Sequence, residues 1–117
     1  MTVSRVNIAN SALETLGAKA LGQPAEPNLY AKALQAYDEV YSELESDGYV
    51  EWGSTSDVPD EYSYHVINLT AYRLTNIVHL DTDQFVRIQR NAARSESRIK
   101  HINAGVHVPA NTKIDNF

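Results

Sequence analysis

The sequence predicts an all-α protein, a small four-helix bundle with a long loop after the second helix and an extended C-terminal arm. Three observations lead to this fold class. Apolar residues recur at the spacing of a helical face along most of the chain. Glycines and prolines are concentrated between these periodic stretches. The length of 117 residues suits one domain with one core, and because cysteine is absent no disulfide holds it together.

The first helix is predicted over residues 3–16. Thr2 or Ser4 has the side chain that an N-cap needs, and Gly17 stands where helices often end in the left-handed conformation. Its apolar residues are spaced 3, 4 and 3 apart and form one stripe: Val6, Ala9, Leu13 and Leu16.

The second helix is predicted from Pro27 to Asp47, ending before Gly48. Five residues spaced 4, 3, 4 and 3 apart give the clearest periodic signal in the chain: Tyr30, Leu34, Tyr37, Tyr41 and Leu44. Tyrosine combines an apolar ring with a polar tip, so this stripe suits the edge of a core or a subunit contact. An ordinary core stripe is the preferred interpretation.

A long loop follows over residues 48–58. Three of its apolar residues are expected to form a short extended piece: Tyr49, Val50 and Trp52. Asp57 or Ser56 is a candidate cap for the third helix, which is predicted from Pro59 to Leu80. Because its apolar residues occupy two faces, we expect it to be the central helix.

The fourth helix is predicted over residues 83–103, after a break and cap at residues 81–83, and it should end at Gly105. Residues 1–104 then form the helical domain and residues 105–117 the C-terminal arm. The arm is too short and too weakly apolar for a core of its own, so it either frays or docks on another protein. The candidate docking residues are Val106, Val108, Pro109, Ile114 and Phe117.

Charge is unevenly distributed along the chain. Ten Lys and Arg against 15 Asp and Glu give a net charge of −5, which argues against a general nucleic-acid binder. No basic residue lies between Lys32 and Arg73, and the second helix in this span carries a set of acids: Asp38, Glu39, Glu43 and Asp47. The fourth helix carries four arginines that fall within an arc of about 80° at helical spacing: Arg87, Arg90, Arg94 and Arg98.

Three interpretations of this arginine ribbon remain open. It is a solvated face, a contact with the acidic second helix of a neighbouring copy, or a contact with nucleic-acid phosphates. The second interpretation makes the four arginines and the four acids of the second helix a charge-complementary ring interface, because a heterologous contact of this kind repeats into a ring. Arginine suits such pairing since its fork matches a carboxylate.

The sequence offers little for catalysis. It contains none of the common glycine-rich phosphate-binding motifs and no nucleophile elbow, and its four histidines lack the spacing of a helical zinc site. We therefore expect no enzyme activity, no cofactor and no metal. Glu51 beside Trp52 is the best single candidate for a catalytic acid. No stretch has the length of a membrane span, and the first residues do not resemble a signal peptide.

Several short runs appear in a recognisable order. A-L-E-T-L-G over residues 12–17 ends the first helix, D-G-Y over residues 47–49 ends the acidic helix, and H-V-I-N-L-T-A-Y-R-L over residues 65–74 lies in the third. With the basic fourth helix and the loose arm, this order and spacing resemble the head-to-tail adaptor (connector) proteins of tailed bacteriophages. The closest similarity is to the tail accessory, or packaged-DNA stabilisation, proteins of short-tailed phages, over about residues 5–103.

The resemblance implies a structural protein of the virion neck, made in the cytoplasm of a bacterial host. Such proteins form a ring, typically of about twelve copies, under the portal protein once DNA packaging is complete. The ring extends the channel, through which DNA passes without specific binding, and offers a platform to the tail nozzle or tail tube. The C-terminal arm would reach into the portal ring. The alternatives are a virion-associated peptidoglycan hydrolase and a small helical nucleic-acid-binding protein.

Overall fold

The computed structural model describes residues 2–18, 26–50, 52–53, 56–78 and 80–107, with side chains described as far as Asn103. Four helices carry the fold: α1 (Arg5–Thr15), α2 (Pro27–Ser46), α3 (Asp60–Arg73) and α4 (Thr82–His107). A single 3₁₀ turn, η1 (Leu74–Asn76), follows α3, and two short strands, β1 (Thr2–Val3) and β2 (Val58–Pro59), complete the described part. The predicted all-α fold with four helices is confirmed.

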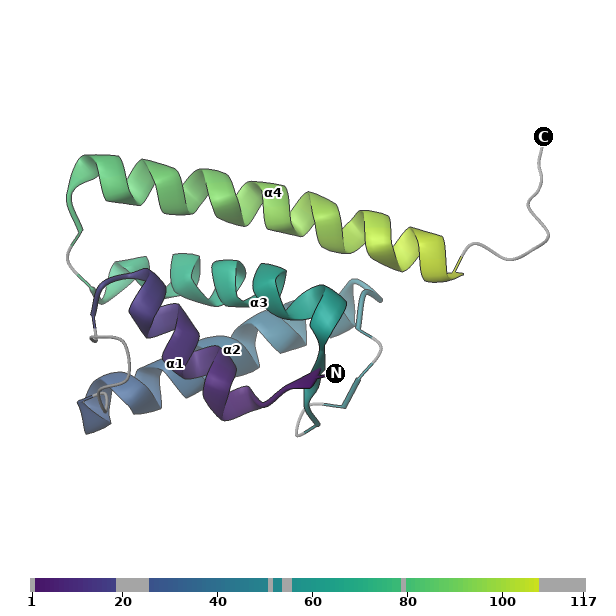
Figure 1. Cartoon of the computed structure of the whole chain (residues 1–117), viewed down its shortest axis with the longest axis horizontal. Helices are drawn as coiled ribbons and strands as arrows, with labels where there is room; N and C mark the ends of the chain where they lie inside the picture. The colour runs from purple at the N-terminus through teal and green to yellow at the C-terminus, as the bar shows by residue number, and fades with distance from the viewer. Residues whose placement is uncertain (1, 19–25, 51, 54–55, 79, 108–117) are drawn as a thin grey trace.

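Helix α3 is the centre of the molecule. It packs against α1 and α2 on one side and against α4 on the other (Figure 1). Helix α4 runs back along α3, and its C-terminal end projects past the start of α3 (Figure 1). The prediction that the third helix is central is therefore confirmed.

Most helix ends follow the local signals in the sequence. The Oγ atom of Ser4 accepts a hydrogen bond from the Asn7 N–H at 3.1 Å, which caps α1. Gly48 has φ +81° just after α2, a conformation that costs little only for glycine. Asp81 caps α4, since its Oδ1 accepts from the Gln84 N–H at 2.8 Å.

Two predicted helix boundaries are wrong. Helix α3 ends at Arg73 and not at Leu80, because the Thr75 hydroxyl donates to the Tyr72 carbonyl at 2.6 Å and η1 tightens the chain. Helix α4 continues to His107, so Gly105 lies within it and does not end it. Glycine near a helix end costs only about 1 kcal/mol, which the preceding turns offset.

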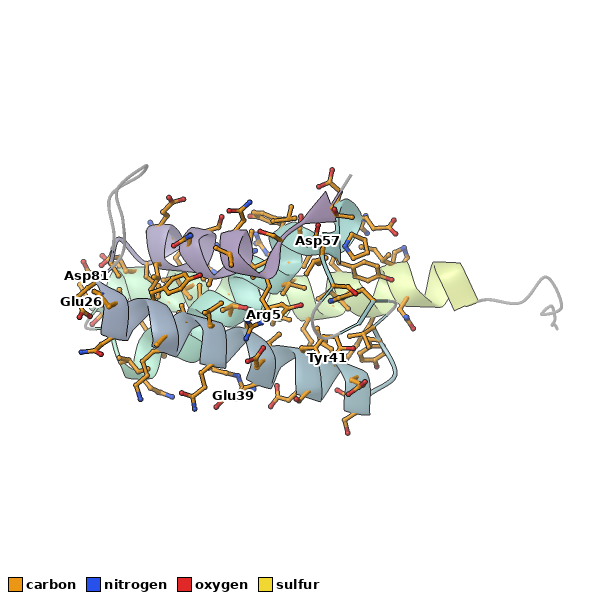
Figure 2. All side chains as sticks on the ribbon, turned by 90° about the horizontal axis from the view of Figure 1, so that it is seen from below. Arg5, Glu26, Glu39, Tyr41, Asp57 and Asp81 are labelled. Carbon is orange, nitrogen blue, oxygen red and sulfur yellow. The ribbon has the colours of Figure 1, made fainter. Side chains whose placement is uncertain are left out.

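The loop before α3 also differs from the prediction. The extended piece is Val58–Pro59, not Tyr49 to Trp52, and it pairs antiparallel with the N-terminal strand in the register Thr2↔Pro59 and Val3↔Val58. Asp57 does not cap α3; its Oδ2 accepts from the Thr2 hydroxyl at 3.2 Å (Figure 2). A two-residue pairing between distant segments leaves no periodic signal, so the sequence could not reveal it.

The tyrosine stripe of α2 belongs to the core. Tyr37 and Tyr41 are buried and approach Trp52, which lies on the loop after α2. The Tyr41 hydroxyl donates to the Trp52 carbonyl at 2.8 Å, and the Trp52 indole N–H donates to the Tyr37 hydroxyl at 3.1 Å. Burial raises the pKa of Tyr37. These bonds satisfy polar tips that would otherwise be costly to bury.

Candidate functional site

The arginine ribbon lies on a face of α4 that is separate from the buried one. Helix α4 buries Ile88, Ala92 and Ile99 against the rest of the molecule. Each of the four ribbon residues is exposed: Arg87, Arg90, Arg94 and Arg98. Within the part of the chain that the structure describes, none of them forms an ion pair. The ribbon is therefore available to a partner.

Three of the four acids predicted for the ring interface already have partners within the chain. Asp38 makes a two-pronged pair with Arg5 of α1, with Nε–Oδ1 3.0 Å and Nη2–Oδ2 2.7 Å. Arg73 of α3 pairs with Glu39 at 3.5 Å and with Glu43 at 2.5 Å. These hydrogen bonds raise the pKa of both arginines. Sequence reasoning missed the pairs because Arg5 and Arg73 lie outside the acidic span.

The fourth acid, Asp47, is different. It is exposed at the end of α2, and no ion pair engages its side chain among the described residues. The paired acids also keep much of their exposure, with 51% of the Asp38 side chain and 67% of the Glu43 side chain accessible. The acidic surface is thus reduced by internal pairing but not removed.

A groove between α3 and α4, which we call the basic groove, carries two of the ribbon arginines. It encloses about 270 Å³ and is lined by Tyr64, His65, Asn68, Asn91, Arg94, Ser95 and Arg98. At its floor the Ser95 hydroxyl accepts from the Asn68 amide at 2.9 Å and lies 3.1 Å from Nδ1 of His65. Burial lowers the pKa of His65, and the charge of Arg98 lowers it further. None of the described residues in this lining carries a carboxylate.

A second groove, which we call the acidic groove, lies between α2, α3 and α4. It encloses about 440 Å³. Its acids are Glu43, Asp47 and Glu96, with Arg73 among them, and its apolar wall includes Tyr72 and Phe85, whose ring centroids are 6.3 Å apart.

The two grooves lie on opposite sides of α4. Glu96 of the acidic groove follows Arg94 of the basic groove by two residues, a rotation of about 200° around the helix axis. Phe85 precedes Arg94 by nine residues, which again places it about 180° away. One helix therefore separates a surface that is rich in unpaired arginine from one that holds carboxylates and exposed aromatic rings.

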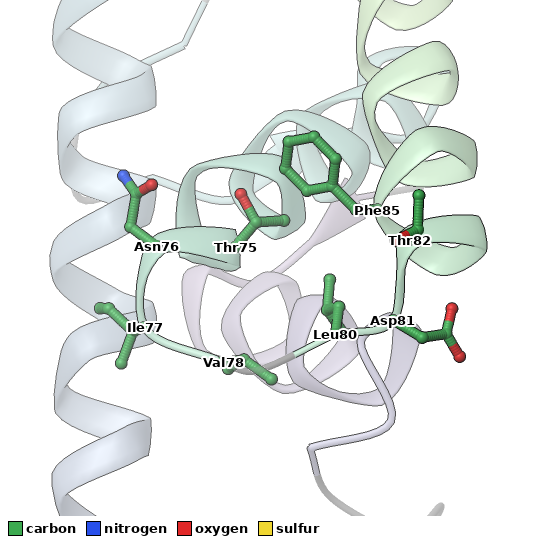
Figure 3. Close-up of a pocket in the computed structure, with 8 residues that line it drawn as sticks. All are labelled: Thr75, Asn76, Ile77, Val78, Leu80, Asp81, Thr82 and Phe85. Atoms are coloured by element: carbon green, nitrogen blue, oxygen red, sulfur yellow. The ribbon is translucent and has the colours of Figure 1, made fainter.

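A third depression lies at the turn between α3 and α4 (Figure 3). It encloses about 400 Å³ and is lined by Thr75, Asn76, Ile77, Val78, Leu80, Asp81, Thr82 and Phe85. Among the described residues of this lining, Asp81 is the one titratable group, and its carboxylate is engaged in capping α4. The described residues of the lining therefore offer no pair of groups for acid and base catalysis.

Some predicted residues lie outside the described ones. Glu51, the candidate acid, is among them, and so are four residues of the predicted arm: Val108, Pro109, Ile114 and Phe117. Val106 belongs to α4. Among the described residues no group of three or more acids and histidines is placed to hold a metal ion, and no helix there has the length and apolar character of a membrane span.

Comparison with protein-family models found no match to this chain, and neither did searches of curated proteins and of solved structures.

Proposed function

We propose that this protein is a structural head-to-tail adaptor of a tailed phage virion. Copies of the chain join side by side into a ring under the portal, and the ring extends the DNA channel and carries the tail nozzle or tail tube. In this role the protein is not an enzyme and needs no cofactor. The order of sequence features that resembles phage connectors motivates the proposal, and the surface of α4 supports it.

The single observation that carries the proposal is the placement of the two grooves on opposite sides of α4. A ring requires two different surfaces on each copy, so that the first surface of one copy meets the second surface of the next. The basic groove and the acidic groove meet this requirement, and their charges are complementary. Tyrosine, phenylalanine and arginine, which line them, are also enriched at protein interfaces.

The remainder of the C-terminal arm is proposed to attach to the portal. Helix α4 continues to His107, and its C-terminal end projects past the start of α3 (Figure 1). The proposed arm therefore comprises residues 108–117, and its apolar residues Val108, Ile114 and Phe117 are the proposed contacts with the portal.

Mixing the full chain with the portal protein of the same virus tests the proposal. We expect a defined ring on the portal, measured by mass photometry and electron microscopy. Arg94→Glu should reduce ring formation, whereas Lys32→Glu, an exposed reversal on α2 outside both grooves, should not. Deleting residues 108–117 should leave the helical circular dichroism intact and abolish attachment. A chain that stays monomeric beside the portal would refute the proposal.

The unpaired ribbon also favours a second function, which is nucleic-acid binding. Its signature is affinity for duplex DNA that falls steeply with salt. If the protein binds duplex DNA strongly at low salt and Arg90→Glu abolishes this binding, the ribbon is a DNA-binding surface. A turbidity assay on cell walls, with Glu51→Gln as control, tests the hydrolase alternative in the same way.

A further inference from the structure

We propose that the basic groove is a binding site for one carboxylate group and that this group is Asp47 of a second copy. The inference rests on the proposed ring in its choice of partner, but the binding of an anion to the groove does not require the ring. Of the four arginines and four acids predicted to form the ring interface, these are the residues that we expect to meet.

The first argument is a contrast between arginines. Arg5 and Arg73 each find carboxylates of α2 within the chain. Arg94 and Arg98 line the basic groove one helical turn apart and have no such partner among the described residues. Two neighbouring guanidinium groups at this spacing repel each other, and an anion bound between them removes the repulsion.

The second argument is the size and character of the groove. Its volume of about 270 Å³ is enough for a single acidic side chain. The half-buried Asn91 amide lies in the lining, and Tyr64 at the rim is 62% exposed. An exposed tyrosine beside two arginines is typical of the centre of a protein interface. These features favour a protein carboxylate over a nucleic-acid phosphate.

The third argument concerns the source of the carboxylate. Asp38, Glu39 and Glu43 are already paired, whereas Asp47 is exposed at the end of α2 and no described cation pairs with it. Asp47 lines the acidic groove, on the side of α4 opposite to the arginines. A chain cannot easily bring these two sides together within itself, but the next copy in a ring can.

His65 gives a readout of occupancy that does not depend on assembly. The other titratable or charged groups among the described residues of the groove are Tyr64 on α3 and Arg94 and Arg98 on α4. Neutralising Arg98 with an anion removes one of the two causes that lower the pKa of His65. Occupancy of the groove should therefore raise the pKa of His65.

The first experiment titrates the dilute full-length protein with sodium acetate at constant ionic strength and follows the His65 ring by NMR. We expect a saturable rise in the pKa of His65 in the wild type and in Lys100→Gln, which changes an exposed cation of α4 outside both the groove and the ribbon. The rise should be absent in Arg94→Gln/Arg98→Gln. No response in the wild type, or an equal response in all three proteins, would overturn the anion site.

The second experiment reverses charges across the proposed contact. Arg94→Glu and Asp47→Arg should each raise the concentration needed for assembly by about tenfold or more, and the double variant that carries both should recover wild-type assembly. Asp60→Arg, an exposed reversal outside the groove, is the control. Circular dichroism checks that each variant folds.

The two experiments separate the possible failures. If acetate binds but the double variant assembles no better than the single ones, the second copy is not the partner and this proposal is wrong, while the ring can still form by other contacts. If duplex DNA instead competes with acetate for the groove, the site belongs to phosphate and the protein carboxylate is excluded.

Discussion

At the scale of single residues, the aromatic cluster explains why so many tyrosines serve a small core. Tyr37 and Tyr41 bury their rings and direct their hydroxyls at Trp52, which both donates and accepts. Trp52 therefore fastens the loop after α2 to the helix. The spacing of the tyrosines predicted a core stripe, but their hydrogen-bond partner lies in an irregular segment that has no periodic signal.

Replacing Trp52 tests this role. Trp52→Ala should lower the free energy of unfolding by about 3–5 kcal/mol because it leaves a large cavity and removes the indole N–H that donates to the Tyr37 hydroxyl. Trp52→Phe should cost less, since the ring volume is largely kept and only the indole N–H is lost. Urea unfolding followed by circular dichroism measures both. Equal losses for the two variants would contradict the account.

His65 should make stability depend on pH. Its pKa is lower in the folded state than in the unfolded state, so the unfolded chain binds more protons as the pH falls through about 6.5. The contribution of neutral His65 to the free energy of unfolding is therefore present above that pH and is lost below it. Protonation also turns Nδ1 into a donor beside Ser95, whose hydroxyl already accepts from Asn68.

The measurement compares unfolding of the wild type with that of His65→Gln at about pH 7.5 and about pH 5.5. The wild type should lose more stability on acidification than the variant does. His101→Gln, an exposed change on α4, should behave like the wild type. The prediction fails if His65→Gln retains the full wild-type dependence.

At the scale of elements, local signals placed the helices well and their ends less well. Ser4, Gly17 and Gly48 mark ends that the sequence predicted, because caps and left-handed glycines are local chemistry. The early end of α3 was missed, since apolar residues continue beyond Arg73 into η1 and keep helical spacing there. Periodicity reports which face is buried, and it does not report where a backbone turns.

Gly48 offers a test of helix termination. Gly48→Ala should cost about 1–2 kcal/mol, because the residue has φ +81° and an L side chain is strained in that conformation. Among the described residues, no atom beyond the two chain neighbours lies within 4 Å of the added Cβ, so the expected cost comes from backbone strain. Ser46→Ala, exposed in the last turn of α2, should change stability by less than about 0.5 kcal/mol. Thermal or urea unfolding distinguishes the two.

The two faces of α4 should have different roles, since the buried face stabilises the fold and the exposed face binds a partner. Ile99 is fully buried, and Ile99→Ala should cost about 2–5 kcal/mol in unfolding free energy. Arg94→Glu, on the exposed face, should change stability by less than about 0.5 kcal/mol while it impairs assembly. Denaturation and mass photometry on the same two variants check this. A large loss of stability in Arg94→Glu would mean that the ribbon supports the fold and not a partner.

At the scale of the whole molecule, the fold class followed from the sequence but the surface did not. The arginine ribbon was visible as spacing on one helix, whereas the basic groove needs α3 to supply His65 and Asn68 opposite it. The pairing of the acids with Arg5 and Arg73 likewise depends on how three helices meet. Contacts between elements that are distant in sequence are what spacing cannot predict.

Assembly driven by these grooves should be sensitive to salt. Raising the ionic strength to about 1 M shortens the screening length to about 3 Å and weakens exposed charge pairs. We expect the assembled fraction, measured by sedimentation velocity, to fall with added sodium chloride in the wild type. Assembly that strengthens with salt would point to the apolar wall around Tyr72 and Phe85 as the main contact instead.

The position of α4 between its two grooves has a consequence for geometry. Because this helix forms one wall of each groove, its roll on α3 sets the angle between a copy's two contacts. Closure with a given number of subunits needs a fixed turn per contact, about 30° for twelve. Enlarging Ala92, which lies on the buried face of α4, would tilt both walls together. Such a change should alter the number of subunits in the ring before it alters the affinity of the contact between them.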